Sequence, residues 1–273
     1  MAQIDLKECT IKVFDGTLGA ATLDSTATDS DLTFTANSRH IGSDKISVTF
    51  VDPATASASL SVAVSGRAIT VNLATSTASA ITTTAAEVQT AIQGDTDANA
   101  LVAVTFAETS GAGIVDAQAE VTLDGQQSVE VRLGEGNAVF TEHSAKEFKL
   151  DRGQLYTVKS ADEQPVDLTV DAMWEYLTAV TASGTPTVDD AMKRRGEAAA
   201  WVSTADDQCQ PYCVDIEIWN APDCTAVEDE LIMFEEFYVE TADHDLREGT
   251  LQFAGRCNRT AAVPRRVLNA DIG

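Results

Sequence analysis

The sequence predicts a mainly β protein that consists of two domains, one inserted into the other. Two observations indicate this. Apolar and polar residues alternate along many short segments, as in half-buried strands, and the composition changes abruptly over residues 17–128. The chain of 273 residues is long for one average domain and sufficient for two, and 44% of its residues are hydrophobic. We therefore expect a discontinuous outer domain, 1–16 plus 129–273, and an inserted domain, 17–128.

The inserted segment is rich in Ala, Thr, Ser and Val and contains neither Cys nor Trp. Alternating apolar residues predict strands over 46–50, 60–64, 69–73, 102–106 and 121–123. A short turn with Gly66 predicts that the strands over 60–64 and 69–73 form a hairpin. Thr84 and Glu87 have the spacing of a capping box and precede an apolar stripe, so a helix is expected there, closed by Gly94 in a left-handed conformation. This segment should form a small β-rich domain with one short helix.

The outer segments also contain strand patterns. They are expected over 10–14, 129–133, 138–141, 148–150, 165–174, 214–218, 234–239 and 250–254. In the strand expected over 165–174, alternation places Trp174 on the apolar face. A helix is expected over 188–200, with two aspartates near its positive N-terminal end. Insertions are tolerated where chain ends lie close together, so Phe14 and Val129 should be neighbours on paired strands.

Acidic residues dominate the charge of the chain. Forty-three acids and 18 bases give a formal net charge of −25. Such a surface repels phosphate, so tight binding to nucleic acid or to an anionic membrane is not expected. The apolar runs are far shorter than the 18 residues of a membrane-spanning helix, and residues 1–8 lack the basic-then-apolar pattern of a secretory signal.

The sequence contains no motif typical of an enzyme, and we expect neither catalysis nor a cofactor. There are three His, and neither a nucleophile elbow nor a phosphate-binding loop is present. The tripeptide 243–245, Asp-His-Asp, could bind a metal, but a polar turn between strands is the favoured interpretation.

Four of the five cysteines lie in the last quarter of the chain: Cys209, Cys213, Cys224 and Cys257. Four thiolates could hold a structural zinc ion, or two pairs could form disulfides. The usual pairs separated by two residues are absent. Buried free thiols are therefore the favoured interpretation, and a metal site is the alternative.

Three passages of the outer segments, taken in order, are specific enough for a comparison. The first passage begins with residues 133–137 and ends with 149–153. The second begins with 162–166 and ends with 174–176, and the third combines 211–216 with 243–246 and 249–250. Together they resemble the major tail (tail tube) proteins of long-tailed bacteriophages. The inserted segment resembles a module that recurs in phage virion proteins, through residues 31–36, 66–73, 82–88 and 123–125.

The resemblance implies a β-sandwich or barrel subunit with a flanking helix, and an inserted domain on the outside of a tube. Six copies would form a ring, and rings would stack around a tape-measure protein, with tail-terminator and tail-tip proteins as further partners. Double-stranded DNA would pass through without tight binding. The protein would be located in the virion tail, and in the host cytoplasm before assembly. Another virion decoration protein, or a module that binds host surfaces or glycans, is the alternative.

An acidic inner wall would repel DNA and let it slide. The polar faces of two predicted strands supply candidates for the lumen or for an interface: Glu130, Arg132, Asp167 and Asp171. Trp219 lies on the polar face of its strand and is a candidate interface anchor. A second packed layer over that face is an equally good explanation for Trp219.

Overall fold

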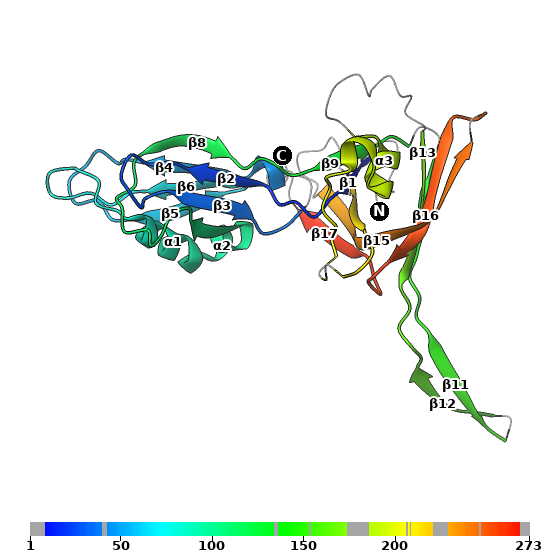
Figure 1. Cartoon of the computed structure of the whole chain (residues 1–273). Coiled ribbons are helices and arrows are strands. Elements are labelled where there is room, and N and C mark those ends of the chain that lie inside the picture. The colour runs from blue at the N-terminus through cyan, green and yellow to red at the C-terminus, as the bar shows by residue number, and fades with distance from the viewer. Residues whose placement is uncertain are drawn as a thin grey trace. The chain divides into compact units, whose positions relative to one another are not determined.

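The computed structural model describes residues 9–39, 43–133, 136–152, 154–173, 186–205, 207, 209–220, 229–245 and 247–267. The fold is mainly β, as expected (Figure 1). The chain divides into two compact units. The first consists of the chain up to Gly16 together with Ser128–Val267, and the second contains Thr17–Gln127.

The first unit contains an eight-stranded sheet with the strand order β10-β13-β16-β15-β14-β1-β9, in which β17 also pairs with β15. Its strands are β1 (Cys9–Phe14), β9 (Ser128–Val131), β10 (Ala138–Thr141), β13 (Val166–Met173), β14 (Val214–Asn220), β15 (Asp229–Asp245), β16 (Thr250–Cys257) and β17 (Val263–Val267). Strand β13, next to one end of this order, approaches β9 at the other end, because the N–H of Met173 donates a 2.7 Å hydrogen bond to the carbonyl of Arg132, directly after β9. The sheet therefore curls around one core.

Strands β1 and β9 are antiparallel neighbours. Val13 lies opposite Val129 and Phe14 opposite Ser128. The expected pairing of the segments on either side of the insertion is confirmed. The chain thus leaves the first unit at the end of one strand and re-enters it at the start of the adjacent strand.

The curled sheet and one helix enclose the core of the first unit. Helix α3 (Val188–Lys193) begins at Thr187, whose hydroxyl accepts a 3.1 Å hydrogen bond from the N–H of Asp190. Three of its residues pack into the core: Val188, Ala191 and Met192. The expected helix over 188–200 is too long. Arg194 (φ 50°) and Gly196 (φ 55°) adopt left-handed conformations that end α3, and the chain continues as the short 3-10 helix η4 (Gly196–Ala198).

A bulge in β15 fixes how this long strand contributes to the core. The register with β14 shifts between Val214 and Ile216, and Glu236 has a φ of 51°. The shift turns both Phe234 and Phe237 into the core, where each is at most 1% exposed. Simple alternation would place these two residues on opposite faces of the strand.

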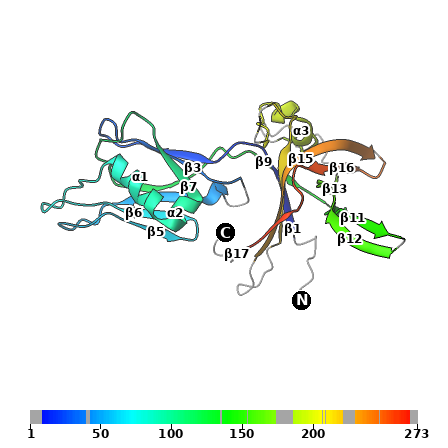
Figure 2. The same cartoon turned by 90° about the horizontal axis from the view of Figure 1, so that it is seen from below.

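A two-stranded hairpin stands apart from the eight-stranded sheet (Figures 1 and 2). It is formed by β11 (Lys146–Asp151) and β12 (Gln154–Ser160), and we call residues 146–160 the arm. In the sequence the arm lies between β10 and β13, whose pairing begins where Thr141 faces Asp167. The sequence predicts the first strand of the arm; the second was missed.

The second unit contains two sheets, ordered β2-β3-β7 and β5-β6-β4-β8. Their strands are β2 (Ala20–Leu23), β3 (Leu32–Ala36), β4 (Ser47–Val51), β5 (Ser61–Ser65), β6 (Ala68–Asn72), β7 (Val102–Phe106) and β8 (Gln118–Thr122), with a 3-10 helix η2 (Ser43–Lys45). The expected hairpin of β5 and β6 is confirmed, and Gly66 in its turn has a φ of 58°. The β4–β6 pair is parallel.

The described residues of the second unit form two α-helices, which corrects the expectation of one. Helix α1 (Ala85–Gly94) has the expected capping box: Thr84 Oγ1 accepts from the N–H of Glu87 at 3.3 Å, and Glu87 Oε2 accepts from the N–H of Thr84 at 2.9 Å. Gly94 does not close the helix in a left-handed conformation. Instead Asp95, with extended backbone, ends α1 and caps α2 (Thr96–Leu101) through its side chain.

Candidate functional site

Three of the five candidate residues, Glu130, Asp167 and Asp171, lie on the polar faces of β9 and β13, as expected. Arg132 directly follows β9, which ends at Val131 and not at the expected residue 133. Glu130 and Arg132 are exposed, whereas the intervening Val131 is buried. On β13, Asp167 and Asp171 alternate with buried apolar residues and are half-buried. The candidates are therefore outside the core of their own unit. That they line a lumen stays a prediction.

Asp167 is the centre of a charged cluster at the point where the arm joins the sheet. Its carboxylate oxygens lie 2.8 Å from His143 Nε2 and 3.0 Å from Arg256 Nε. Arg256 also lies 3.7 Å from Glu240. The hydrogen bond with His143, assisted by the one from Arg256, holds the pKa of Asp167 below its usual value. The cluster ties the segment before β11 to the start of β13, a role that the sequence alone did not indicate for His143.

The face of β14 that carries Asp215, Glu217 and Trp219 is covered by other parts of the unit. This favours the interpretation of a second packed layer over that of an open face. Asp215 and Glu217 are only 3% and 1% exposed. Asp215 accepts a 2.9 Å hydrogen bond from the N–H of Glu236 in the bulge of β15. Trp219, the next residue on this face, is half-buried. Its role as an interface anchor stays a prediction.

Cys209, Cys213 and Cys257 are free thiols. Cys213 and Cys257 are buried, as expected, whereas Cys209 is exposed, so the expectation of burial is wrong for Cys209. Burial, with a smaller effect of the nearby Asp215, raises the pKa of Cys257 to about 12. Cys224 lies outside the described residues, as does Trp174. Within the described ranges, no group of three His, Cys, Asp or Glu residues is arranged to hold a metal ion.

The tripeptide 243–245 forms the end of β15, so its interpretation as a turn is wrong. His244 Nε2 lies 3.1 Å from Asp189 Oδ1 and 3.4 Å from Lys193 Nζ, both on α3. These contacts hold the helix against the end of the strand. His244 therefore has a structural role that accounts for its position.

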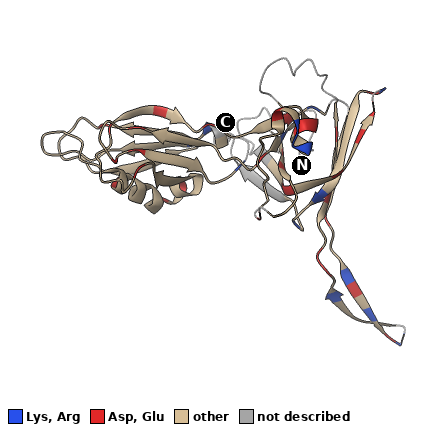
Figure 3. Cartoon of the chain, viewed as in Figure 1, with Lys and Arg blue, Asp and Glu red and all other residues tan. Residues whose placement is uncertain are grey.

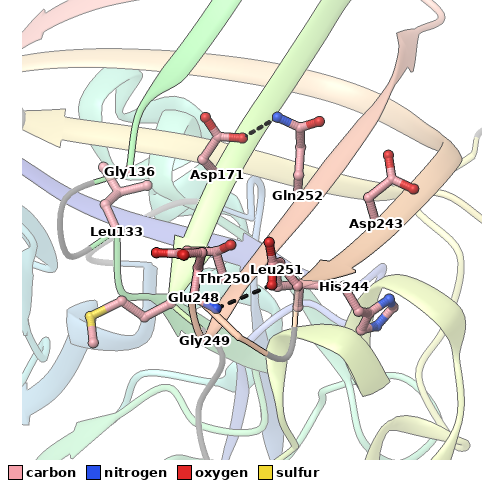
Figure 4. Close-up of a pocket in the computed structure, with 12 residues that line it drawn as sticks. Leu133, Gly136, Asp171, Asp243, His244, Glu248, Gly249, Thr250, Leu251 and Gln252 are labelled. Carbon is pink, nitrogen blue, oxygen red and sulfur yellow. Dashed lines mark hydrogen bonds between the residues drawn. The ribbon is translucent and has the colours of Figure 1, made fainter.

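An acidic pocket of about 890 Å³ lies beside the end of β15 (Figure 4). Its carboxylates come from β13, from β15 and from the turn before β16: Asp171, Asp243, Asp245 and Glu248. Asp171 accepts a 2.5 Å hydrogen bond from Gln252. Leu133 and Met173, the latter 50% exposed, add apolar surface to the lining. We call this site the acidic pocket.

The arm has one apolar face that is exposed to solvent. Phe148 lies opposite Val158, and Leu150 opposite Leu155, so these four side chains share a face. Their exposed fractions range from 50% to 72%, and Tyr156 beside them is 77% exposed. Alternation of Phe148 and Leu150 was visible in the sequence, but their partners belong to the strand that was missed.

The arm is also basic, in a chain that is strongly acidic. Figure 3 shows blue residues on both strands of the arm, with red beside them. Its charged side chains are four bases, Lys146, Lys149, Arg152 and Lys159, and two acids, Glu147 and Asp151. The arm therefore differs from the rest of the chain in both charge and apolar exposure.

Comparison of the chain with protein-family models, with curated proteins and with solved structures finds no match. None of the helices in the described ranges is both long and apolar enough to span a membrane.

Proposed function

We propose that the chain is a structural subunit of a phage tail, which assembles into six-membered rings that stack into a tube for DNA delivery. The observation that carries this proposal is the arm. An isolated two-stranded hairpin is at best marginally stable in water. Four large apolar side chains on one of its faces are half or more exposed. Such a surface is typical of a protein that becomes complete only in an assembly.

The distribution of acids supports the same function. Asp167 lies on the outer face of β13, and Glu130 on that of β9. When copies surround a common axis with these faces inward, their carboxylates repel the phosphates of a DNA duplex. Repulsion keeps the duplex from adhering to the wall, which suits a conduit.

The test compares the full chain with variants of the arm's apolar face. The wild-type chain should form rings and longer assemblies, as measured by size-exclusion chromatography with light scattering. The variant Phe148→Ser with Leu155→Ser should remain folded, because both side chains are mostly exposed, but should no longer assemble. Ile114→Ser, which changes a side chain that is 45% exposed in the second unit, is the matched control and should assemble normally. A wild-type chain that stays monomeric at all concentrations would refute the proposal.

A further inference from the structure

We propose that the arm of one copy of the chain docks into the acidic pocket of a second copy. The proposal rests on the proposed function, since it requires that copies assemble, and it names the two surfaces that meet.

Charge complementarity identifies the occupant of the pocket. Four carboxylates line it, and no Lys or Arg is among its lining residues in the described part of the chain. The arm contains four of the 18 basic residues of the chain within its 15 residues. A basic segment on an acidic chain is attracted to the acidic surfaces of other copies, and opposite charges across an interface fix its register.

Apolar complementarity supports the same pairing. The pocket offers Leu133 and the half-exposed Met173 between its carboxylates. Its volume of about 890 Å³ is near the upper end of the range for sites that enclose a drug-sized ligand, roughly 300–1,000 Å³. The apolar face of the arm would cover Leu133 and Met173. Lys146 lies on that face and Lys149 on the opposite one, and the long side chains of both would reach the carboxylates at the rim.

The positions of the two surfaces on β13 determine what kind of assembly results. The arm joins the sheet at Asp167, and the pocket lies at Asp171 and Met173, at the other end of the strand. At about 3.3 Å per residue, the two ends are roughly 20 Å apart. A contact between different surfaces at opposite ends of a subunit is heterologous, so each docked copy presents a new pocket and the assembly extends unless the rotation between copies closes it into a ring. This is the geometry that a stack of rings needs.

The test reverses the charges of each surface in the full chain. The arm variant is Lys146→Glu with Lys149→Glu, and the pocket variant is Asp243→Lys with Glu248→Lys. All four side chains are exposed. Each variant alone should assemble more than about tenfold less readily than the wild type, because like charges then face each other. The matched control, Lys45→Glu with Glu108→Lys in the second unit, should assemble like the wild type.

A mixture of the two variants provides the decisive observation. In the mixture, the reversed arm meets the reversed pocket and the native arm meets the native pocket. Equal amounts should therefore assemble to within about threefold of the wild type. Docking of the arm within its own chain predicts no rescue on mixing, so an absence of rescue would overturn the proposal. Normal assembly of each variant alone would also overturn it and leave the proposed function intact, whereas a wild-type chain that fails to assemble would refute the proposed function itself.

Discussion

Excision of residues 17–127, with Gly16 joined directly to Ser128, should leave the first unit folded. Phe14 and Ser128 lie opposite each other on adjacent antiparallel strands. After the excision only Asp15 and Gly16 separate these two positions. Asp-Gly is a favoured sequence for a two-residue hairpin turn, so the new connection suits the strands that it joins.

The expected cost is small because the two cores share no residue. The core of the first unit lies outside 17–127, and the core of the second lies within it. Stability can be lost at the joint, where two hydrogen bonds connect to Val202. The carboxylate of Asp15 accepts a 3.0 Å hydrogen bond from the N–H of Val202, and the N–H of Gly16 donates a 2.8 Å hydrogen bond to the carbonyl of Val202. Two hydrogen bonds of about 1 kcal/mol each give a loss of at most about 2 kcal/mol in the free energy of unfolding.

A longer excision, 17–131, is the matched control. It removes β9 with Val129 and Val131, which are only 6% and 5% exposed. Two buried valines at roughly 1.5–3 kcal/mol each correspond to a loss of about 3–6 kcal/mol. The control should therefore be clearly less stable than the shorter excision.

Tryptophan fluorescence provides the assay, because all three Trp residues lie outside the excised segment. Urea unfolding of the shorter excision should show one cooperative transition, with a midpoint about 1 M or less below that of the full chain. Absence of a cooperative transition, or a loss as large as that of the control, would refute the separation of the two cores.

Three further predictions concern individual side chains. Thr84→Ala should destabilise the second unit by about 1 kcal/mol, because Thr84 Oγ1 accepts from the N–H of Glu87 at the start of α1; unchanged hydrogen exchange in α1 would contradict this. Cys209 should react with an alkylating reagent at pH 8 within minutes and Cys257 only on unfolding, because burial raises the pKa of Cys257 to about 12; equal rates in peptide mapping would contradict it. Hydrogen bonds from the hydroxyl and the N–H of Ser110 hold the pKa of Asp29 well below its usual value, so Asp29 stabilises the fold above about pH 4 and this contribution is lost as the pH falls. Asp29→Asn should therefore reduce the drop in thermal midpoint between pH 5 and pH 3, and an unchanged drop would argue against this role.

The parts of the fold that sequence reasoning predicted depend on local patterns. Alternation identified β1, β13 and β16, because the apolar residues of these strands face one core. Thr84 and Glu87 marked the start of α1, because a capping box is a local interaction. The second helix was missed since Asp95 ends one helix and caps the next at a single position, where a C-terminal Gly94 suggested a stop.

The parts that were missed depend on contacts between distant segments. The bulge at Glu236 breaks the period-two pattern of β15, so sequence periodicity could not reveal the full length of that strand. For the face of β14 that carries Trp219, the sequence left an interface and a second packed layer as equal alternatives. The burial of Asp215 and Glu217, and the hydrogen bond from the bulge to Asp215, become visible only in the folded chain. The apolar face of the arm likewise combines side chains from two strands, of which only β11 was predicted.

Electron cryo-microscopy of the purified full chain tests the central claim most directly. We predict rings with sixfold symmetry that stack into a hollow tube, with carboxylates at the bore and each arm in contact with another copy. Dispersed single copies, closed twofold dimers, or a bore lined by lysine and arginine would contradict it.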